Sequence, residues 1–235
     1  MDARNRLIVA LDVPTAEAAR ALLDQLAGEV GLFKVGSQLF TAAGPGFVQE
    51  IVGRDEDVFL DLKFHDIPNT VAGAVSSASR LGVSLVDVHG LGGRAMLEAA
   101  VGALPAMKTR LLAITILTSH DEKSLGQIGV NGSVPDSVRR LALLARDSGA
   151  DGVVASPHEV AVIREACGSD FLIVTPGIRP AGATTGDQAR AATPATALAA
   201  GADYLVVGRP ITAAEDPRAA AAAIVREMEL ALGRD

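Results

Sequence analysis

Residues 58–70 read VFLDLKFHDIPNT, an apolar run that leads into a cluster of charged side chains. The apolar start predicts a buried strand, and side chains two positions apart on a strand point to the same face. Asp61 and Lys63 therefore project together, while the neighbouring leucines face the other way. Pro68 suits the first turn of a helix, so we expect a helix to begin just before it. Asp61, Lys63 and a second acid, Asp66, are thus expected to lie close together at the junction between a strand and a helix.

Charged side chains are costly to bury unless they are paired, so this cluster requires a reason. An ion pair that closes the strand end is the simple explanation for Asp61 and Lys63 taken alone. Structural ion pairs also perturb charged groups, so the pair by itself does not mark an active site. The rest of the chain decides between the two explanations.

Apolar runs like 58–60 recur along the chain and alternate with helical patterns rich in Ala and Leu. The runs are short and continuous, as expected for strands of a parallel sheet that is covered on both faces. Predicted strands lie at residues 7–11, 32–36, 58–63, 84–89, 111–116, 152–155, 171–174 and 204–207. Predicted helices lie at residues 14–27, 46–52, 67–81, 95–103, 134–148, 157–166, 194–200 and 217–232, with a long loop at 117–133.

Eight strand–helix units in 235 residues predict an α/β fold, a TIM (β/α)8 barrel that forms a single domain over residues 1–235. A doubly wound sheet would carry a glycine-rich turn after its first strand, whereas this chain has LDVP at 11–14. Gly82, Gly149 and Gly201 stand just before predicted strands, where glycine commonly ends the preceding helix. No shift in composition marks a second domain.

Composition excludes several classes of function. The net charge of −7 argues against a surface for nucleic acid or an anionic membrane, so an anionic ligand would need a local basic pocket. Cys167 is the only cysteine, which rules out a disulfide framework and a cysteine-based metal cluster. The first apolar run has five residues, too few for a signal peptide or a membrane span. We therefore expect a cytoplasmic protein.

The predicted barrel brings several charged residues together, because TIM barrels carry their active sites at the carboxyl ends of the strands. Asp12 ends the first predicted strand, and Lys34 comes late in the second. Asp61 and Lys63 end the third. These charges alternate in sign along one sector of the rim, so each has an opposite charge beside it. A network at this place favours a functional site over a structural ion pair.

The opposite sector of the rim has the features of a phosphate site. TIM barrels often bind phosphate with the loops after strands seven and eight. Gly208 lets the backbone approach a ligand closely, and Arg209 offers a planar fork of donors. Pro210 is suited to start a short helix there. The polar loop after strand seven adds Arg179 and Gln188, and its length is typical of a lid.

The segment DLKFHDIPNT at 61–70 resembles the signature of the orotidine 5′-phosphate decarboxylase family. Shorter resemblances follow in order: LDV at 11–13, FKVGSQLF at 33–40, LTS at 117–119, TPGIRP at 175–180, Gln188 and VGRPI at 207–211. The resemblance implies a TIM barrel, a homodimer, and a reaction that needs neither a metal nor an organic cofactor. The implied reaction is decarboxylation of orotidine 5′-monophosphate (OMP) to UMP and CO₂, the last step of de novo pyrimidine nucleotide biosynthesis.

The resemblance also implies roles for the charged residues of the rim. Lys63 would be the catalytic proton donor to carbon C6 of the pyrimidine, and Asp61 would sit beside the substrate carboxylate. Lys34 would bridge the ribose and the charge network, and Asp12 would hold a ribose hydroxyl.

Further residues would complete the site. Asp66, a catalytic residue in this assignment, would reach into the neighbouring subunit's site together with Ile67 and Thr70. Thr118 would touch the substrate near the fifth loop, and Ser119 would contribute to pyrimidine recognition. The phosphate or the closing lid would be bound by Arg179, Gln188, Gly208 and Arg209.

Other classes of protein stay open from the sequence. The 3-keto-gulonate 6-phosphate decarboxylases and hexulose-phosphate synthases share the Asp-x-Lys-x-x-Asp pattern but use Mg²⁺. Their metal site has an acidic residue where this chain has Lys34, and a cation there opposes Mg²⁺ binding. A non-catalytic phosphate-sugar binding protein would account for Gly208 and Arg209 but not for Asp61 and Lys63. A histidine-based hydrolase or metal enzyme is disfavoured, because the four histidines lack metal-ligand spacing.

Overall fold

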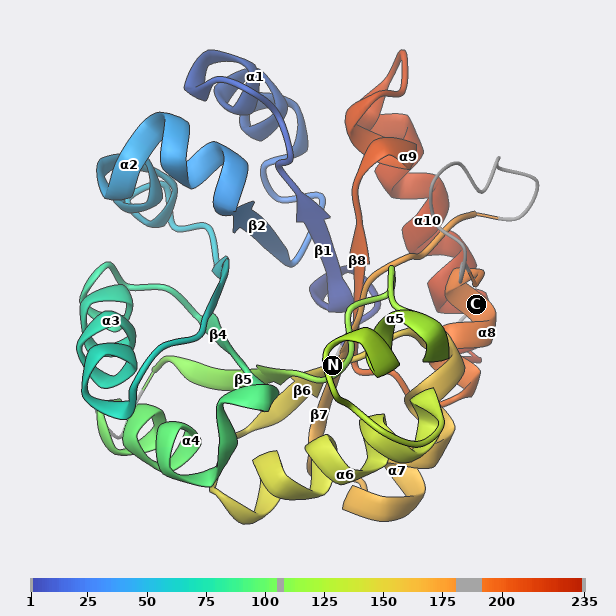
Figure 1. Cartoon of the computed structure of the whole chain (residues 1–235). Coiled ribbons are helices and arrows are strands. Elements are labelled where there is room, and N and C mark those ends of the chain that lie inside the picture. The colour runs from blue at the N-terminus through green and yellow to red at the C-terminus, as the bar shows by residue number, and fades with distance from the viewer. Residues whose placement is uncertain (1, 105–107, 181–191, 234–235) are drawn as a thin grey trace.

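The computed structural model describes residues 2–104, 108–180 and 192–233. These residues form a closed barrel of eight parallel strands in chain order, in which the first strand also pairs with the last. Helices surround the strands (Figure 1), so the predicted TIM barrel is confirmed. The strands are β1 (Leu7–Ala10), β2 (Leu32–Gly36), β3 (Val58–Phe64), β4 (Leu85–His89), β5 (Arg110–Ile114), β6 (Gly152–Val154), β7 (Leu172–Thr175) and β8 (Tyr204–Val207).

Helices connect the strands on the outside of the barrel (Figure 1). None of the helices in the described part of the chain is long and apolar enough to cross a membrane. The α-helices are α1 (Ala16–Leu26), α2 (Ser37–Val52), α3 (Pro68–Arg80), α4 (Gly93–Gly102), α5 (Glu122–Gln127), α6 (Val134–Asp147), α7 (Val160–Cys167), α8 (Pro194–Ala199), α9 (Arg209–Thr212) and α10 (Pro217–Ala231). Short 3₁₀ helices lie at Arg4–Arg6, Gly90–Gly92 and Pro157–Glu159.

Helix α2 begins earlier than its sequence pattern indicates. The sequence predicts a helix only from residue 46, whereas α2 starts at Ser37. Gly44 interrupts α2 with a φ of 72°, directly before Pro45, which has no N–H to donate. Glycine and proline are the two poorest helix formers, so this pair hides the first part of the helix from sequence analysis.

The long loop predicted at 117–133 contains the short helix α5. The carboxylate of Asp121 accepts the backbone N–H of Ser124, and the Ser124 hydroxyl oxygen accepts the N–H of Asp121 in return. Leu125 is the only buried residue of this helix, so no apolar period announces it in the sequence.

The glycines predicted to end helices do so. Gly82, Gly149 and Gly201 follow α3, α6 and α8 and have φ values of 87°, 89° and 107°. Residues that carry a side chain rarely adopt a positive φ, whereas glycine adopts it freely. Each glycine therefore lets the backbone turn back towards the next strand.

Two apolar cores fill the interior of the barrel and the space between strands and helices. On β2, β3 and β4 the inward residue that follows the inner core is charged: Lys34, Asp61 and Asp87. Because every second residue of a strand faces the same side, these three charged side chains point into the barrel, nearer the carboxyl ends of the strands than the inner core. The buried inner core consists of Ile8, Ala10, Leu32, Phe59, Leu85, Leu112, Val174, Tyr204 and Val206.

Candidate active site

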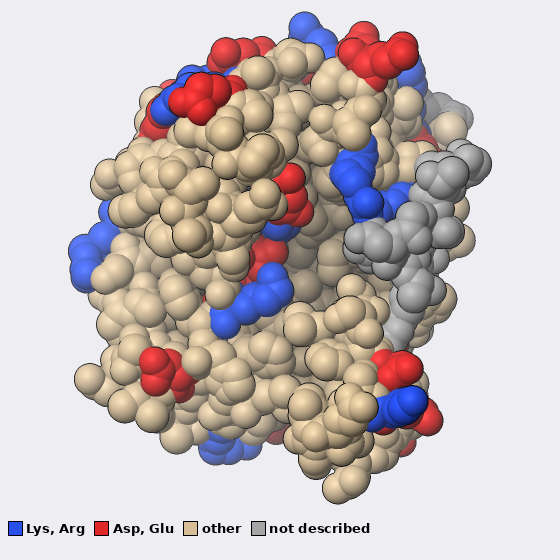
Figure 2. All heavy atoms as spheres, turned by 45° about the horizontal axis from the view of Figure 1, so that its top comes forward, with Lys and Arg blue, Asp and Glu red and all other residues tan. Residues whose placement is uncertain are grey.

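A pocket of about 490 Å³ opens at the carboxyl ends of the strands. The face shown in Figure 2 is hollowed, and both basic and acidic atoms are exposed in the hollow. The pocket is lined by residues from strands on all sides of the barrel, as expected for a TIM-barrel active site. The predicted site residues that line it are Asp12, Lys34, Asp61, Lys63, Thr118, Arg179, Gly208 and Arg209.

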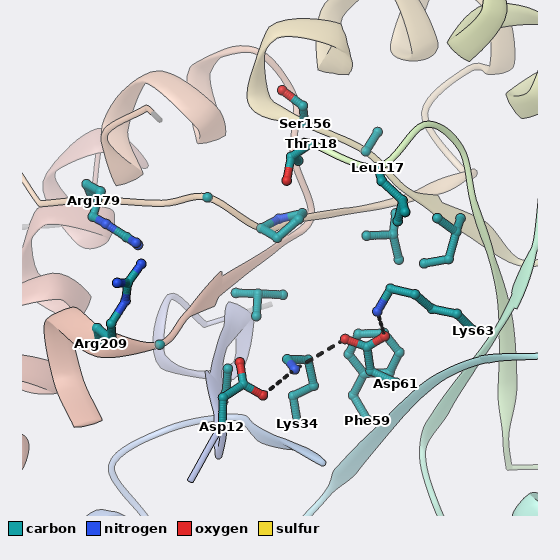
Figure 3. A pocket seen from close by; sticks show the side chains of 18 of the residues that line it. Asp12, Lys34, Phe59, Asp61, Lys63, Leu117, Thr118, Ser156, Arg179 and Arg209 are labelled. Carbon is teal, nitrogen blue, oxygen red and sulfur yellow. Dashed lines mark hydrogen bonds and ion pairs between the residues drawn. The ribbon is translucent and has the colours of Figure 1, made fainter. Parts of the chain in front are cut away.

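Four of these side chains form a continuous chain of ion pairs (Figure 3). Lys34 Nζ lies 2.9 Å from Asp12 Oδ1 and 3.2 Å from Asp61 Oδ2. Lys63 pairs with the other carboxylate oxygen of Asp61. The Lys34 and Asp61 side chains are 10% and 12% exposed, whereas Lys63 is 37% exposed and opens onto the pocket. The chain of charges predicted at the rim is therefore present, with its buried centre at Lys34 and Asp61.

The pairing keeps both buried groups charged. Burial alone would lower the pKa of Lys34, but the charges of Asp61 and Asp12 outweigh burial and raise this pKa above its ordinary value. Burial alone would likewise raise the pKa of Asp61, but the charge of Lys34, a hydrogen bond with Asp87 and the charge of Lys63 lower it to about 2. The pocket floor therefore presents a fixed carboxylate between two ammonium groups at neutral pH.

A glycine at the end of β2 leaves room for these ion pairs. A Cβ atom on Gly36 would lie 3.0 Å from Lys34 Nζ and 3.1 Å from Asp12 Oδ1. Both contacts are tighter than a side chain normally tolerates, so any larger residue would push the two charged groups aside. No local pattern around Gly36 indicates this role, because it depends on where two side chains meet in space.

Arg179 and Arg209 lie at the opposite end of the pocket from Lys63, and their guanidinium groups point toward one another (Figure 3). Arg209 begins the short helix α9, close to the helix start predicted at Pro210. Burial, and then the charge of Arg209, lower the pKa of Arg179 below its ordinary value. Two converging cations of this kind suit an anionic ligand such as a phosphate.

Some predicted site residues do not line the pocket. Asp66, Ile67 and Thr70 are exposed on the segment that leads from β3 into α3, and the Ile67 side chain is 67% exposed. Ser119 is also exposed and lies outside the pocket wall. Gln188 lies outside the described residues.

Two buried residues near the pocket were missed by sequence analysis. Ser156 lines the pocket directly after β6, close to Thr118 in Figure 3. Asp87 on β4 is fully buried, and its Oδ1 accepts the backbone N–H of Lys63 at 2.7 Å. The sequence did contain a signal for Asp87, since an acid in the middle of an apolar strand is unusual.

Histidines lie beside the pocket but do not form a metal site. His65 is exposed and stacks on His89, with ring centroids 5.2 Å apart. Nδ1 of His89 accepts the backbone N–H of Leu91, as expected for a hydrogen-bonded structural histidine. Burial, and then the neighbouring positive charges, lower the pKa of His89 to about 4, so this ring is neutral at pH 7. Within residues 2–104, 108–180 and 192–233, no group of three His, Cys, Asp or Glu side chains is placed to hold a metal ion.

A barrel of this kind, with paired ammonium and carboxylate groups fixed in a pocket at the strand ends, defines the class of TIM-barrel enzymes. The chain belongs to the orotidine 5′-phosphate decarboxylase / HUMPS family, whose family model matches residues 5–224.

Individual relatives support this membership. The chain is 54% identical over 238 residues to the orotidine 5′-phosphate decarboxylase of Moorella thermoacetica, covering 98% of this chain and 94% of that protein. It is 59% identical over 228 residues to the enzyme of the same name from Halorhodospira halophila, covering 96% and 97%. The crystal structure of orotidine 5′-phosphate decarboxylase from Lactobacillus acidophilus superposes with a TM-score of 0.85 at 40% identity, covering 94% of this chain and 98% of that one.

Proposed function

We propose that this chain decarboxylates OMP to UMP and CO₂, the last step of de novo pyrimidine nucleotide biosynthesis, with Lys63 as the proton donor to C6. The relatives that cover nearly all of the chain carry the name of this activity. The single structural observation that supports it best is the Asp61 carboxylate held between the ammonium groups of Lys34 and Lys63 at one end of the pocket.

The chemistry needs such an array. When the bond between C6 and the carboxylate breaks, CO₂ leaves and the electron pair stays on C6, in the plane of the ring where the π system cannot absorb it. A fixed ammonium at Lys63 stabilises this developing carbanion and then gives it a proton. Asp61 and Lys34 hold that ammonium in place before the reaction begins, so little reorganisation is needed at the moment of bond cleavage.

The other end of the substrate supplies binding energy. In this proposal Arg179, Arg209, Gly208 and Gln188 bind the phosphate, and Asp12 and Lys34 bind the ribose. The two arginines support this assignment because they converge across the pocket from Lys63 (Figure 3). Binding energy from the phosphate then orients the pyrimidine at the reacting end.

We further propose that the active unit is a homodimer with shared sites, in which Asp66, Ile67 and Thr70 enter the partner's pocket. Their exposure in the single chain supports this, because a large apolar side chain such as Ile67 gains stability when a partner covers it. Contact of Thr118 with the substrate, a contribution of Ser119 to pyrimidine recognition, independence of a cofactor, and a cytoplasmic location stay predictions.

The test is incubation of the purified chain with OMP in excess EDTA, with the change in ultraviolet absorbance followed as UMP forms. Rapid turnover by the parent, and none by Lys63→Ala, is the expected result. Turnover of a sugar phosphate only after addition of Mg²⁺ would move the chain to the metal-using branch of the family. Binding of OMP or UMP without turnover in either condition would make it a phosphate-sugar binding protein.

A further inference from the structure

The pairing between β3 and β4 is irregular beside the pocket. Leu60 lies opposite Val86, and the next pair in register is Phe64 opposite Val88. The segment 61–63 on β3 therefore faces one residue of β4, Asp87. Such a bulge breaks the ladder of backbone hydrogen bonds and turns the strand, and bulges are frequent next to active sites.

Lys63 stands at the end of this bulge in an unusual conformation. Its φ is 51°, the left-handed region that residues with a side chain rarely occupy. Its backbone N–H donates to Oδ1 of Asp87 at 2.7 Å, within the stretch where the register between β3 and β4 is broken. The side chain of Asp87 thus takes the place of a ladder hydrogen bond at the residue that carries the pocket ammonium.

Asp87 lies behind the pocket wall, where it interacts with the backbone of Lys63 and with the side chain of Asp61. It is fully buried and does not line the pocket, so it cannot touch a ligand there. Its second oxygen, Oδ2, has no hydrogen-bond partner among the described residues. A fully buried acid beside the Asp61 carboxylate is costly to keep, so its hydrogen bond to the Lys63 backbone calls for a purpose.

We propose that Asp87 is a positioning residue: by accepting the backbone N–H of Lys63 it holds the bulge in the conformation that aims the Lys63 ammonium across Asp61 into the pocket. This inference rests on the proposed role of Lys63 as proton donor. Burial, and then the charge of Asp61, raise the pKa of Asp87 well above its ordinary value, so its carboxyl loses its proton less readily than an exposed one. The hydrogen bond from the Lys63 backbone requires an acceptor oxygen at this place, and an asparagine side chain provides one.

The test compares Asp87→Ala, which removes the acceptor, with Asp87→Asn, which keeps it. Asp87→Ala is expected to lower kcat by about 100-fold, the effect of a misplaced reacting group, while its affinity for UMP stays unchanged. Asp87→Asn is expected to keep kcat close to that of the parent. Hydrogen exchange of the Lys63 amide is expected to be slow in the parent and in Asp87→Asn, and fast in Asp87→Ala.

The barrel offers a matched control. Oδ2 of Asp151 accepts the backbone N–H of Leu111, also at 2.7 Å. This hydrogen bond lies at the start of β5, whereas the pocket lies at the carboxyl ends of the strands. Asp151→Ala therefore removes the same kind of hydrogen bond. It is expected to lower the melting temperature without changing kcat, which separates a loss of stability from a loss of positioning.

Two results would overturn the inference. One is a folded Asp87→Ala variant with the kcat of the parent, and the other is an Asp87→Asn variant that has lost its activity, because the charge or proton of Asp87 would then be what matters. If Asp87→Ala does not fold, the activity of Asp87→Asn still tests the inference. Absence of OMP turnover in the parent would defeat the proposed function instead, and amide exchange at Lys63 would still report whether Asp87 holds this backbone.

Discussion

Lys34 and Asp61 form a buried ion pair between the ends of β2 and β3, with 3.2 Å between Lys34 Nζ and Asp61 Oδ2. Both side chains are nearly inaccessible to solvent, so neither charge has water to replace a lost partner. Breaking a buried pair by removing one member is far more damaging than breaking a surface pair. The pair therefore stabilises the barrel as well as shaping the pocket floor.

Replacing Lys34 by methionine should lower the free energy of unfolding by about 3 kcal/mol, because the Asp61 carboxylate loses its buried partner. Arg20→Met is the control, since it breaks the half-exposed pair that Arg20 makes with Glu50 and should cost clearly less. Urea denaturation at pH 7 measures both values. Equal losses in the two variants would show that the pocket pair is no more than an ordinary ion pair.

Replacing Lys63 by alanine or by glycine should lower kcat/KM by about 10⁴-fold or more, because both changes remove the proton donor and its charge. The two variants should differ in stability. The φ of 51° at this position is strained for alanine and free for glycine, so Lys63→Gly should be the more stable by about 1 kcal/mol. Steady-state kinetics measure the loss of activity in the two variants, and thermal melts measure their difference in stability. Substantial turnover by either variant would remove Lys63 from its proposed role.

Replacing Arg209 by alanine should lower kcat/KM for OMP by roughly 10- to 100-fold, the value of a charged hydrogen bond to the phosphate. The same variant should be no worse than the parent with orotidine, which has no phosphate. Arg218→Ala is the control, because Arg218 pairs with Glu29 on the surface, away from the pocket. An equal loss with OMP and with orotidine would mean that Arg209 supports the fold of the pocket and does not bind phosphate.

The unfolding free energy of Asp87→Asn should exceed that of the parent by an amount that grows as the pH rises above about 4. Because the pKa of this carboxyl is raised in the folded state, the unfolded chain loses the proton at a lower pH than the folded protein does, so this group makes the parent less stable as the pH rises between the two pKa values. Asparagine cannot ionise and escapes the effect. The lowered pKa of Asp61 acts in the opposite direction, with its stabilisation lost only as pH falls towards about 2, and it is common to both proteins.

Urea denaturation at several pH values between 5 and 8 tests this linkage. The difference between the two proteins should rise by up to about 1.4 kcal/mol per pH unit, until the pH reaches the folded-state pKa of Asp87. A difference that stays constant over this range would show that Asp87 is ionised in the folded protein.

Mixing inactive Lys63→Ala and Asp66→Asn chains should restore activity if the sites of a homodimer are shared. Each mixed dimer then has one site with both residues intact, so random pairing recovers about a quarter of the parent activity. Unmixed samples of each variant, refolded in the same way, are the controls. No recovery from samples shown to contain mixed dimers would confine Asp66 to its own chain.

Much of the fold could be read from the sequence because it depends on local patterns. Short apolar runs with glycine before them predicted the strands of the barrel, and the structure confirms them to within a few residues. Two helices were harder to see. Gly44 and Pro45 obscure the first half of α2, and α5 buries one residue, so neither shows the periodic apolar face on which prediction relies.

The sequence by itself determined that Asp12, Lys34, Asp61 and Lys63 would meet, because each ends a parallel strand and those ends share one side of the barrel. Only the tertiary structure decided how Lys63 is held. The bulge that places the Asp87 carboxyl beside the Lys63 backbone depends on the register between β3 and β4, whose paired residues lie 24 to 26 positions apart along the chain. Register is set by packing across the whole barrel, so no local pattern in the sequence contains it.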